Sequence, residues 1–218
     1  MTKIRLIVSA VCLIATVALI PQPASAGVVY TTLGPSGEYV VFGTIVDSNQ
    51  VIADLFTLGA GTTVGDAVLA LGHYGANNNP VNVYIESDSS GPGSIIASLS
   101  QVGTILPVDN GFGGGLVTFT CSGAACTLGA GSYWLVAREP YANTGQVWDN
   151  AYLDATTTVA FNLVGSPTGP WSRPYSATAG GFRLDDTGSG VPEPTSILLF
   201  ATGLLGIGIA RRRSIGRG

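Results

Sequence analysis

Lysine is almost absent from the 218-residue chain: Lys3 is the only one, and residues 27–190 contain none. This middle stretch has twelve carboxylates and only three arginines, Arg138, Arg173 and Arg183, which gives a formal charge of 3 − 12 = −9. Because an acidic surface repels phosphate backbones, we expect no nucleic-acid partner. The remaining basic residues lie near the two ends of the chain: Lys3, Arg5, Arg211, Arg212, Arg213 and Arg217.

Histidine is scarce, and the common catalytic motifs are missing. His73 is the only histidine, and the sequence has no Gly-x-Ser-x-Gly, His-Glu-x-x-His or P-loop motif. The acidic pairs Glu86/Asp88 and Asp149/Asp154 are close in sequence, but charged turns explain them better than a glycosidase site. We therefore expect a protein that is not an enzyme and that has no cofactor and no metal site.

Charged residues are absent from the apolar run over residues 6–20, which follows a basic start and precedes a Pro-rich stretch. This is the layout of a secretory signal peptide, and the small residues Ala24 and Ala26 fit a cleavage site before Gly27. We expect residues 1–26 to pass through the Sec machinery and to be removed by signal peptidase. The alternative, an uncleaved membrane anchor, is disfavoured because the run is short and ends in prolines.

Cysteine is scarce, with three residues in all. Cys12 falls in the predicted signal peptide, whereas Cys121 and Cys126 stand in Cys-Ser-Gly-Ala-Ala-Cys between two strand-like runs. In an oxidising compartment such neighbours tend to pair, and four intervening residues allow a tight turn. The sequence therefore predicts a local disulfide. A metal site would need more ligands, and His73 is remote in sequence.

Residues 27–187 lack any sustained helical period of apolar residues. They contain short runs rich in Val, Ile, Thr and aromatics, separated by Gly, Pro, Asn, Asp and Ser. Alternation is clear where Val81, Val83 and Ile85 share one face of a strand. This pattern predicts an all-β domain, an antiparallel β-sandwich or jelly roll. The expected strands are 28–33, 39–46, 51–58, 66–73, 81–86, 95–99, 116–120, 132–137, 146–148, 159–164 and 181–184.

Four aromatic side chains are candidates for stacking on sugar rings: Trp134, Tyr141, Trp148 and Trp171. Flat aromatic faces of this kind would suit a polysaccharide-binding module. The alternative is that they belong to the core, as Trp134 within an apolar strand suggests.

The middle of the chain resembles the choice-of-anchor R domain of exported bacterial proteins. The resemblance rests on residues 81–86 (VNVYIE), 91–97 (GPGSIIA) and 128–136 (LGAGSYWLV). It implies a β-sandwich and an exported location, but no reaction.

The C-terminus resembles the PEP-CTERM sorting signal. A linker over residues 188–194 contains Pro192, Glu193 and Pro194, and an apolar stretch follows over residues 195–210. The stretch predicts a single transmembrane helix, and Arg211, Arg212 and Arg213 form a stop-transfer signal at the start of a basic cytoplasmic tail, residues 211–218. The alternative for the whole tail is a plain membrane anchor.

The resemblance implies an exosortase as processing partner, with Pro192, Glu193 and Pro194 as its recognition motif. It also implies a Gram-negative bacterium, an inner-membrane intermediate and delivery to the cell surface or extracellular matrix. The sequence thus predicts an exported, exosortase-sorted protein with a non-catalytic structural or matrix-interaction domain. The alternatives are an extracellular polysaccharide-binding module and a plain membrane-anchored surface protein.

Overall fold

The computed structural model describes residues 26–74, 80–108, 114–140, 145–163 and 169–188, and Ala26–Gly188 forms one compact unit. In these ranges no helix is long and apolar enough to cross a membrane. The expected span over residues 195–210 lies outside the described residues, as do linker residues 189–194 and the basic tail. The transmembrane helix therefore stays a prediction.

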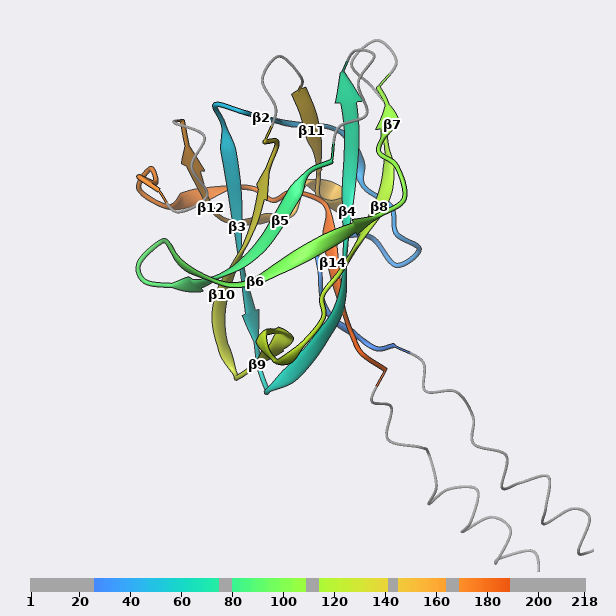
Figure 1. The fold of residues 1–218 in the computed structure, drawn as a ribbon. Helices are drawn as coiled ribbons and strands as arrows, with labels where there is room; N and C mark the ends of the chain where they lie inside the picture. Colours follow the sequence, from blue (N-terminus) through green and yellow to red (C-terminus); the bar gives the residue numbers. More distant parts are fainter. Residues whose placement is uncertain (1–25, 75–79, 109–113, 141–144, 164–168, 189–218) are drawn as a thin grey trace, which may run out of the picture. The chain divides into compact units, whose positions relative to one another are not determined.

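Most of the described residues lie in β-strands, as the sequence predicts (Figure 1). Two single-turn 3₁₀ helices, η1 (Ala124–Cys126) and η2 (Tyr152–Asp154), interrupt the strands. The strands are β1 (Val28–Thr31), β2 (Val40–Asp47), β3 (Val51–Leu58), β4 (Thr62–Tyr74), β5 (Asn82–Asp88), β6 (Pro92–Val102), β7 (Leu106–Pro107), β8 (Gly115–Thr120), β9 (Thr127–Leu128), β10 (Gly131–Arg138), β11 (Gly145–Asn150), β12 (Thr156–Asn162), β13 (Tyr175–Thr178) and β14 (Phe182–Asp186).

The strands form one curled sheet in which nearly all pairs are antiparallel. The hydrogen-bonded order is β1-β14-β4-β8-β6-β5-β10-β3-β12-β13, and β11 joins β2 to β4. Strand β6 connects the two halves of the sheet, because its first part pairs with β5 and its last part, Ser100–Val102, pairs with β8. The pairing of β4 with β7 is parallel.

Strand β4 has the largest number of pairing partners in the sheet. One stretch of it pairs with β14 and β8, its last residues pair with β11 and β7, and its first residues pair with β9. Its side chains Val64, Ala67, Leu69 and Leu71 are fully buried in the main core. An apolar strand with neighbours on both sides is expected at the centre of a sheet.

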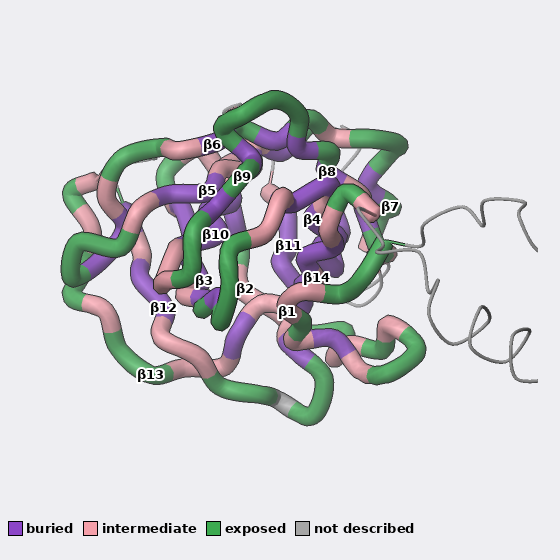
Figure 2. Tube along the Cα trace, turned by 90° about the horizontal axis from the view of Figure 1, so that it is seen from below, coloured by how far each residue is buried: buried purple, intermediate pink, exposed green. Residues whose placement is uncertain are grey.

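The interior contains two apolar clusters, and the burial map shows buried residues along the inner sides of the strands (Figure 2). Strand β3 contributes to both, because successive side chains of a strand point to opposite faces. Ile52, Phe56 and Leu58 join the main core, whereas Val51 and Ala53 join a second cluster on the other face. The other buried members of this second cluster are Trp134, Val136 and Ala160.

Trp148 fixes the packing between β11 and the segment before β14. Its ring makes an edge contact with Phe182 at 6.0 Å between centroids, and its Nε1 donates to the Gly181 carbonyl at 3.1 Å. A β-carbon on Gly180 would collide with the indole ring. Position 180 therefore needs a glycine.

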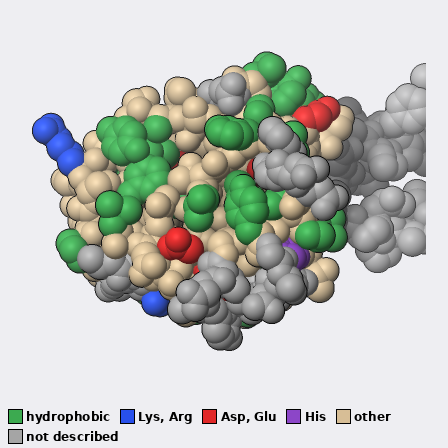
Figure 3. All heavy atoms as spheres, turned by 90° about the horizontal axis from the view of Figure 1, so that it is seen from above, with side chains coloured by type: hydrophobic (Ala, Val, Ile, Leu, Met, Phe, Trp, Pro, Cys, Tyr) green, Lys and Arg blue, Asp and Glu red, His purple; other side chains and the backbone are tan. Residues whose placement is uncertain are grey.

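The surface carries few charges, in keeping with the 10% of charged residues in the sequence. On the face seen from above in Figure 3, hydrophobic side chains lie in separate patches with few charged groups between them. Several apolar side chains in the described part are more than one-third exposed, among them Phe42 at 65% and Leu153 at 77%.

The strand boundaries differ from the expected ones both at sheet edges and inside the sheet, where β6 runs three residues beyond each end of the expected strand 95–99. Strand β13 was not expected, because Tyr175–Thr178 is short, polar and half-exposed. Strands β7 and β9 have two residues each, too few for a period to appear in the sequence. Strand β4 begins four residues before its expected start, since Gly65 and Asp66 hide the alternation there.

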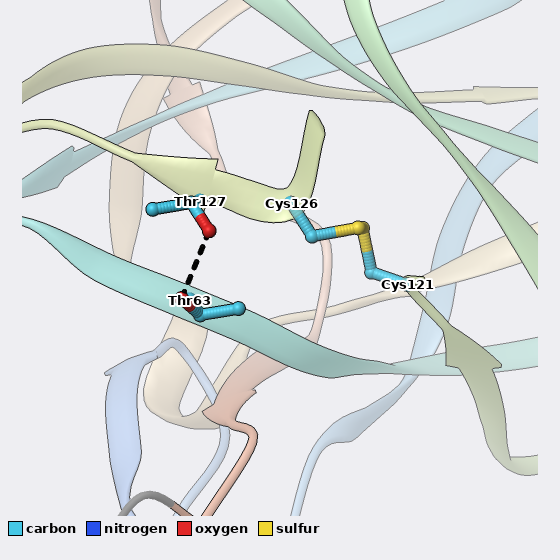
Figure 4. Close-up of a disulfide and its surroundings, with 4 residues drawn as sticks. All are labelled: Thr63, Cys121, Cys126 and Thr127. Carbon is cyan, nitrogen blue, oxygen red and sulfur yellow. Dashed lines mark hydrogen bonds between the residues drawn. A yellow bond between two sulfur atoms is a disulfide. The ribbon is translucent and has the colours of Figure 1, made fainter. Parts of the chain in front are cut away.

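The predicted disulfide is confirmed: Cys121 and Cys126 are bonded, with their Cα atoms 5.9 Å apart (Figure 4). The bond closes a turn that contains η1, and both cysteines are buried in the main core. Cys121 N donates to the Gly65 carbonyl at 2.7 Å, and the Thr63 and Thr127 hydroxyl groups lie 3.0 Å apart. The turn is thereby fastened to the start of β4.

Replacing both cysteines by alanine should destabilise the β unit without unfolding it. A closed loop this short contributes about 2 kcal/mol in the chain-entropy model, while the pairing along β4 remains. Urea unfolding of residues 26–188 measures the difference, and circular dichroism should stay typical of β-structure. A free thiol in the exported wild-type protein would contradict the assignment, as would an unfolded double variant.

Candidate functional site

The structure places only some of the predicted site residues. Ala26 is described and exposed, and Cys121 and Cys126 form the disulfide. The other predicted targeting residues lie outside the described residues: Ala24, Pro192, Glu193, Pro194, Arg211, Arg212 and Arg213.

The tryptophan predictions need correction. Trp134 and Trp148 are each 1% exposed, so neither offers a ring face to a sugar. Both indoles are held by hydrogen bonds, and Trp134 Nε1 donates to Asp88 Oδ1 at 3.0 Å. Trp171 is partly buried and packs against the second cluster. Tyr141 lies outside the described residues.

A narrow cleft opens where the curled sheet ends. Among the described strands, β2 pairs only with β11 and β13 pairs only with β12, so these two strands are free edges. The cleft lies between residues of β2, β3, β11, β12 and β13, is partly open to solvent, and has a water-accessible volume of about 10 Å³, room for about one water molecule. It is lined by Thr44, Ile52, Asp54, Trp148, Asn150, Val159, Phe161, Thr178 and Gly180.

Asp54 is the charged residue of this lining, and its side chain is fully buried. Gly180 N donates to its Oδ2 at 3.2 Å, whereas Oδ1 has no hydrogen-bond partner in the part of the chain that the structure describes. Burial raises the pKa of Asp54 to about 7, against the smaller opposing effect of the Gly180 hydrogen bond. Burial also raises the pKa of Tyr30, and the nearby charge of Asp54 adds to this effect.

Two aromatic side chains accompany the cleft on the β12–β13 side. Phe161 lines it and stacks on Tyr175, with ring centroids 5.9 Å apart, and Tyr175 is 49% exposed. Sequence reasoning missed these side chains, because nothing in the sequence indicates that β13 is an edge strand beside the cleft.

Two further carboxylates are buried elsewhere. Glu86 is fully buried, and neither of its carboxyl oxygens has a hydrogen-bond partner within the described ranges. It lies opposite Trp134 in the β5–β10 register, and burial raises its pKa to about 8. Asp149 is 2% exposed, and burial raises its pKa to about 7. Both residues belong to strands, which corrects their assignment to charged turns.

Within the described ranges, no three His, Cys, Asp or Glu side chains lie close enough together to hold a metal ion. The cleft around Asp54 combines one acceptor, polar neighbours and exposed aromatic surface.

The ends of the β unit meet at Asp186. Gly27 N donates to Asp186 Oδ1 at 2.8 Å, and Asp186 N donates to the Gly27 carbonyl at 2.9 Å. Gly188 N also donates to Asp186 Oδ1 at 2.8 Å. These backbone hydrogen bonds, first that of Gly27, lower the pKa of Asp186.

Comparison with known proteins finds a family match near the C-terminal end of the chain. Residues 190–214 match the family described as the PEP-CTERM protein-sorting motif. The match supports the class of exported bacterial proteins that an exosortase sorts to the cell surface. No curated protein matches the chain.

Stability should fall as the pH rises from about 5 to about 9. The pKa values of Asp54, Glu86 and Asp149 are raised from ordinary values near 4, so between about pH 4 and pH 8 the folded chain binds more protons than the unfolded chain. The stabilisation from these three carboxyl groups is fully present below their pKa values in the unfolded chain. It is lost as the pH rises through their pKa values in the folded chain. Since about 1 kcal/mol corresponds to roughly 2–4 °C in a domain of this size, calorimetry should show a Tm that drops by several degrees.

Glu86→Gln should flatten this decline, because the amide does not titrate. Asp186→Asn is the control, since the lowered pKa of Asp186 places its titration below the tested range. A Tm that rises over the same range would contradict the burial of these carboxylates in solution.

Signal cleavage after Ala26 should leave an N-terminal amino group at Gly27 that pairs with the Asp186 carboxylate. The Gly27 nitrogen would then carry an ammonium group beside the Asp186 carboxylate, and such a pair favours the charged form. We expect N-terminal sequencing to begin at Gly27. The pKa of its amino group, followed by pH-dependent acetylation, should be lower in Asp186→Asn than in the wild type. A mature chain that begins elsewhere, or an equal pKa in both proteins, would contradict this.

Proposed function

We propose that the chain is a surface or extracellular-matrix component of a Gram-negative bacterium, delivered by an exosortase, with a non-catalytic structural and matrix-interaction domain. The match of residues 190–214 to the PEP-CTERM sorting motif carries the proposal. The proposal also includes the resemblance of the middle of the chain to the choice-of-anchor R domain.

The chemistry of the tail supports recognition by a processing enzyme. Prolines on both sides of Glu193 disfavour a helix and favour an extended backbone, which is the form that a protease-like cleft binds. The apolar stretch over residues 195–210 would measure about 24 Å as a helix, short of a bilayer core but sufficient with local thinning. The arginines that follow would hold the tail on the cytoplasmic side during an inner-membrane stage.

The β unit is suited to a role outside the cell. It has an internal disulfide, which suits an oxidising compartment, and its core is made within residues 26–188. Its excess of carboxylates keeps it soluble outside the cell. A plain membrane-anchored surface protein is the alternative, and the processing experiment separates the two.

Glu193→Ala should block C-terminal processing while export and folding continue. The substitution lies beyond the β unit and removes only the charged group of the recognition motif. Intact-mass analysis of surface material from a host with an exosortase measures the effect. Thr187→Ala, an exposed position before the linker, is the matched control and should be processed normally.

Removing Arg211, Arg212 and Arg213 should have a different effect. Without these charges the apolar segment loses its cytoplasmic stop, so part of the chain should be released with its tail uncut. The two variants are then distinguished by mass and by location. Wild-type protein that still ends at Gly218 in such a host would overturn sorting and leave a plain anchor.

A further inference from the structure

The cleft at the free edges of the sheet contains a buried carboxylate that the stability of the fold does not require. Asp54 places a carboxylate on the core-facing side of β3, in the same row as Ile52 and Phe56. Burying an acceptor without a hydrogen bond costs about 1–3 kcal/mol, and an apolar residue would avoid that cost. Asp54 Oδ1 is such an acceptor in the part of the chain that the structure describes, and it lines a cleft that reaches solvent.

The lining defines the polarity of a ligand. Thr44, Asn150 and Thr178 come from three different strands and surround the cleft together with Asp54. Hydroxyl and amide groups both donate and accept hydrogen bonds, whereas the Asp54 carboxylate only accepts when it is ionised. A ligand that fits this set carries several hydroxyl groups.

The charge of the site excludes other ligand classes. Arg138, Arg173 and Arg183, the only basic side chains of residues 27–190, are not part of the lining, so an anionic ligand would meet Asp54 without compensation. A calcium ion needs six to eight oxygen ligands, usually with more than one carboxylate, and Asp54 is the single carboxylate of the cleft. The cleft therefore suits an uncharged ligand.

The aromatic rim defines the shape of the ligand. Phe161 and Tyr175 form a stacked pair on one edge, and half of Tyr175 is exposed. Exposed aromatic side chains beside convergent polar groups are the usual composition of a ligand site. Their flat faces suit the apolar face of a pyranose ring.

We propose that the cleft between β2–β11 and β3–β12–β13 binds a neutral carbohydrate, with a hydroxyl group donating to Asp54 and a ring resting on Tyr175. The space beside Asp54 is small, so one hydroxyl group enters and the ring stays at the rim. Asn150 and Thr178 hold the adjacent hydroxyl groups. Because the cleft is open at its rim, neighbouring sugar units extend outside it.

This inference rests on the proposed function for its location, since an exported domain meets polysaccharides outside the cell. The binding experiment uses purified protein and is independent of processing. A failure of sorting appears only in the mass of the C-terminus, and a failure of this inference appears only in the binding data.

The test uses the full chain in lauryldimethylamine oxide micelles, a detergent without sugar groups. The probes are the neutral hexasaccharides cellohexaose, maltohexaose, mannohexaose and xylohexaose, with an oligogalacturonate as the acidic comparison. Isothermal titration calorimetry should find saturable binding of at least one neutral probe, with a Kd between about 1 μM and 1 mM, and weaker binding of the acidic probe.

Two variants locate the site. Asp54→Asn keeps the volume and an acceptor for Gly180 N, and Tyr175→Ala removes only a half-exposed ring. Each should weaken binding about tenfold or more. The matched controls are Glu86→Gln, a buried carboxylate on the opposite face of the sheet, and Tyr152→Ala, an exposed tyrosine outside the lining. Both controls should bind as the wild type does.

Three results would overturn the proposal. The first is no saturable binding of any neutral probe at about 10 mM, which would leave a water-filled cleft. The second is tighter binding of the acidic probe. The third is binding that neither Tyr175→Ala nor Asp54→Asn weakens, which would place the sugar site elsewhere. Tyr175→Ala keeps the test valid if Asp54→Asn fails to fold, because its side chain is half-exposed on an edge strand.

Discussion

Backbone pairing along β4 is the interaction on which the rest of the structure depends. This strand of thirteen residues pairs with β14 and β8 over one stretch and with β11 over another. Its inner side chains Val64, Leu69 and Leu71 have no exposed surface. Loss of the strand would therefore separate the elements that come from both ends of the domain. The disulfide turn is held to the same strand by the hydrogen bond from Cys121 N to the Gly65 carbonyl, so β4 also positions this short covalent loop.

The curvature that buries the core also leaves the sheet open. Strand β6 turns the sheet from one half to the other, and β2 and β13 are among the described strands that have a single pairing partner. Free edges expose backbone groups and are usually short or polar in native proteins. Here β13 is short and partly exposed, and the cleft lies between the two edges. The position of Asp54 is thus a result of topology, since the same side chain in a closed sheet would not line a cleft.

Alternation of apolar residues was sufficient to predict the β class, because most strands have one face in the core. Residues 81–85 and 116–120 show this directly. It was not sufficient for the edges, since the pairing partners of a strand depend on residues distant in sequence. For the same reason the buried carboxylates were missed: Glu86 and Asp149 follow apolar residues in a polar sequence context, and only the curled sheet buries them. Trp148 could not be assigned to the core until Gly180, thirty-two residues later, was placed against it.

The pairing of β1 with β14 brings the two ends of the β unit together. Val28 lies opposite Asp185 and Gly27 is hydrogen-bonded to Asp186, so the first and last residues of the β unit are neighbours. Every described strand begins after Gly27 and ends before Gly188. Six of the nine basic residues of the sequence stand outside this unit, and none of the nine lines the cleft. The cleft is made only of residues between Thr44 and Gly180, and it therefore depends on the pairing within the β unit and not on sequence beyond it.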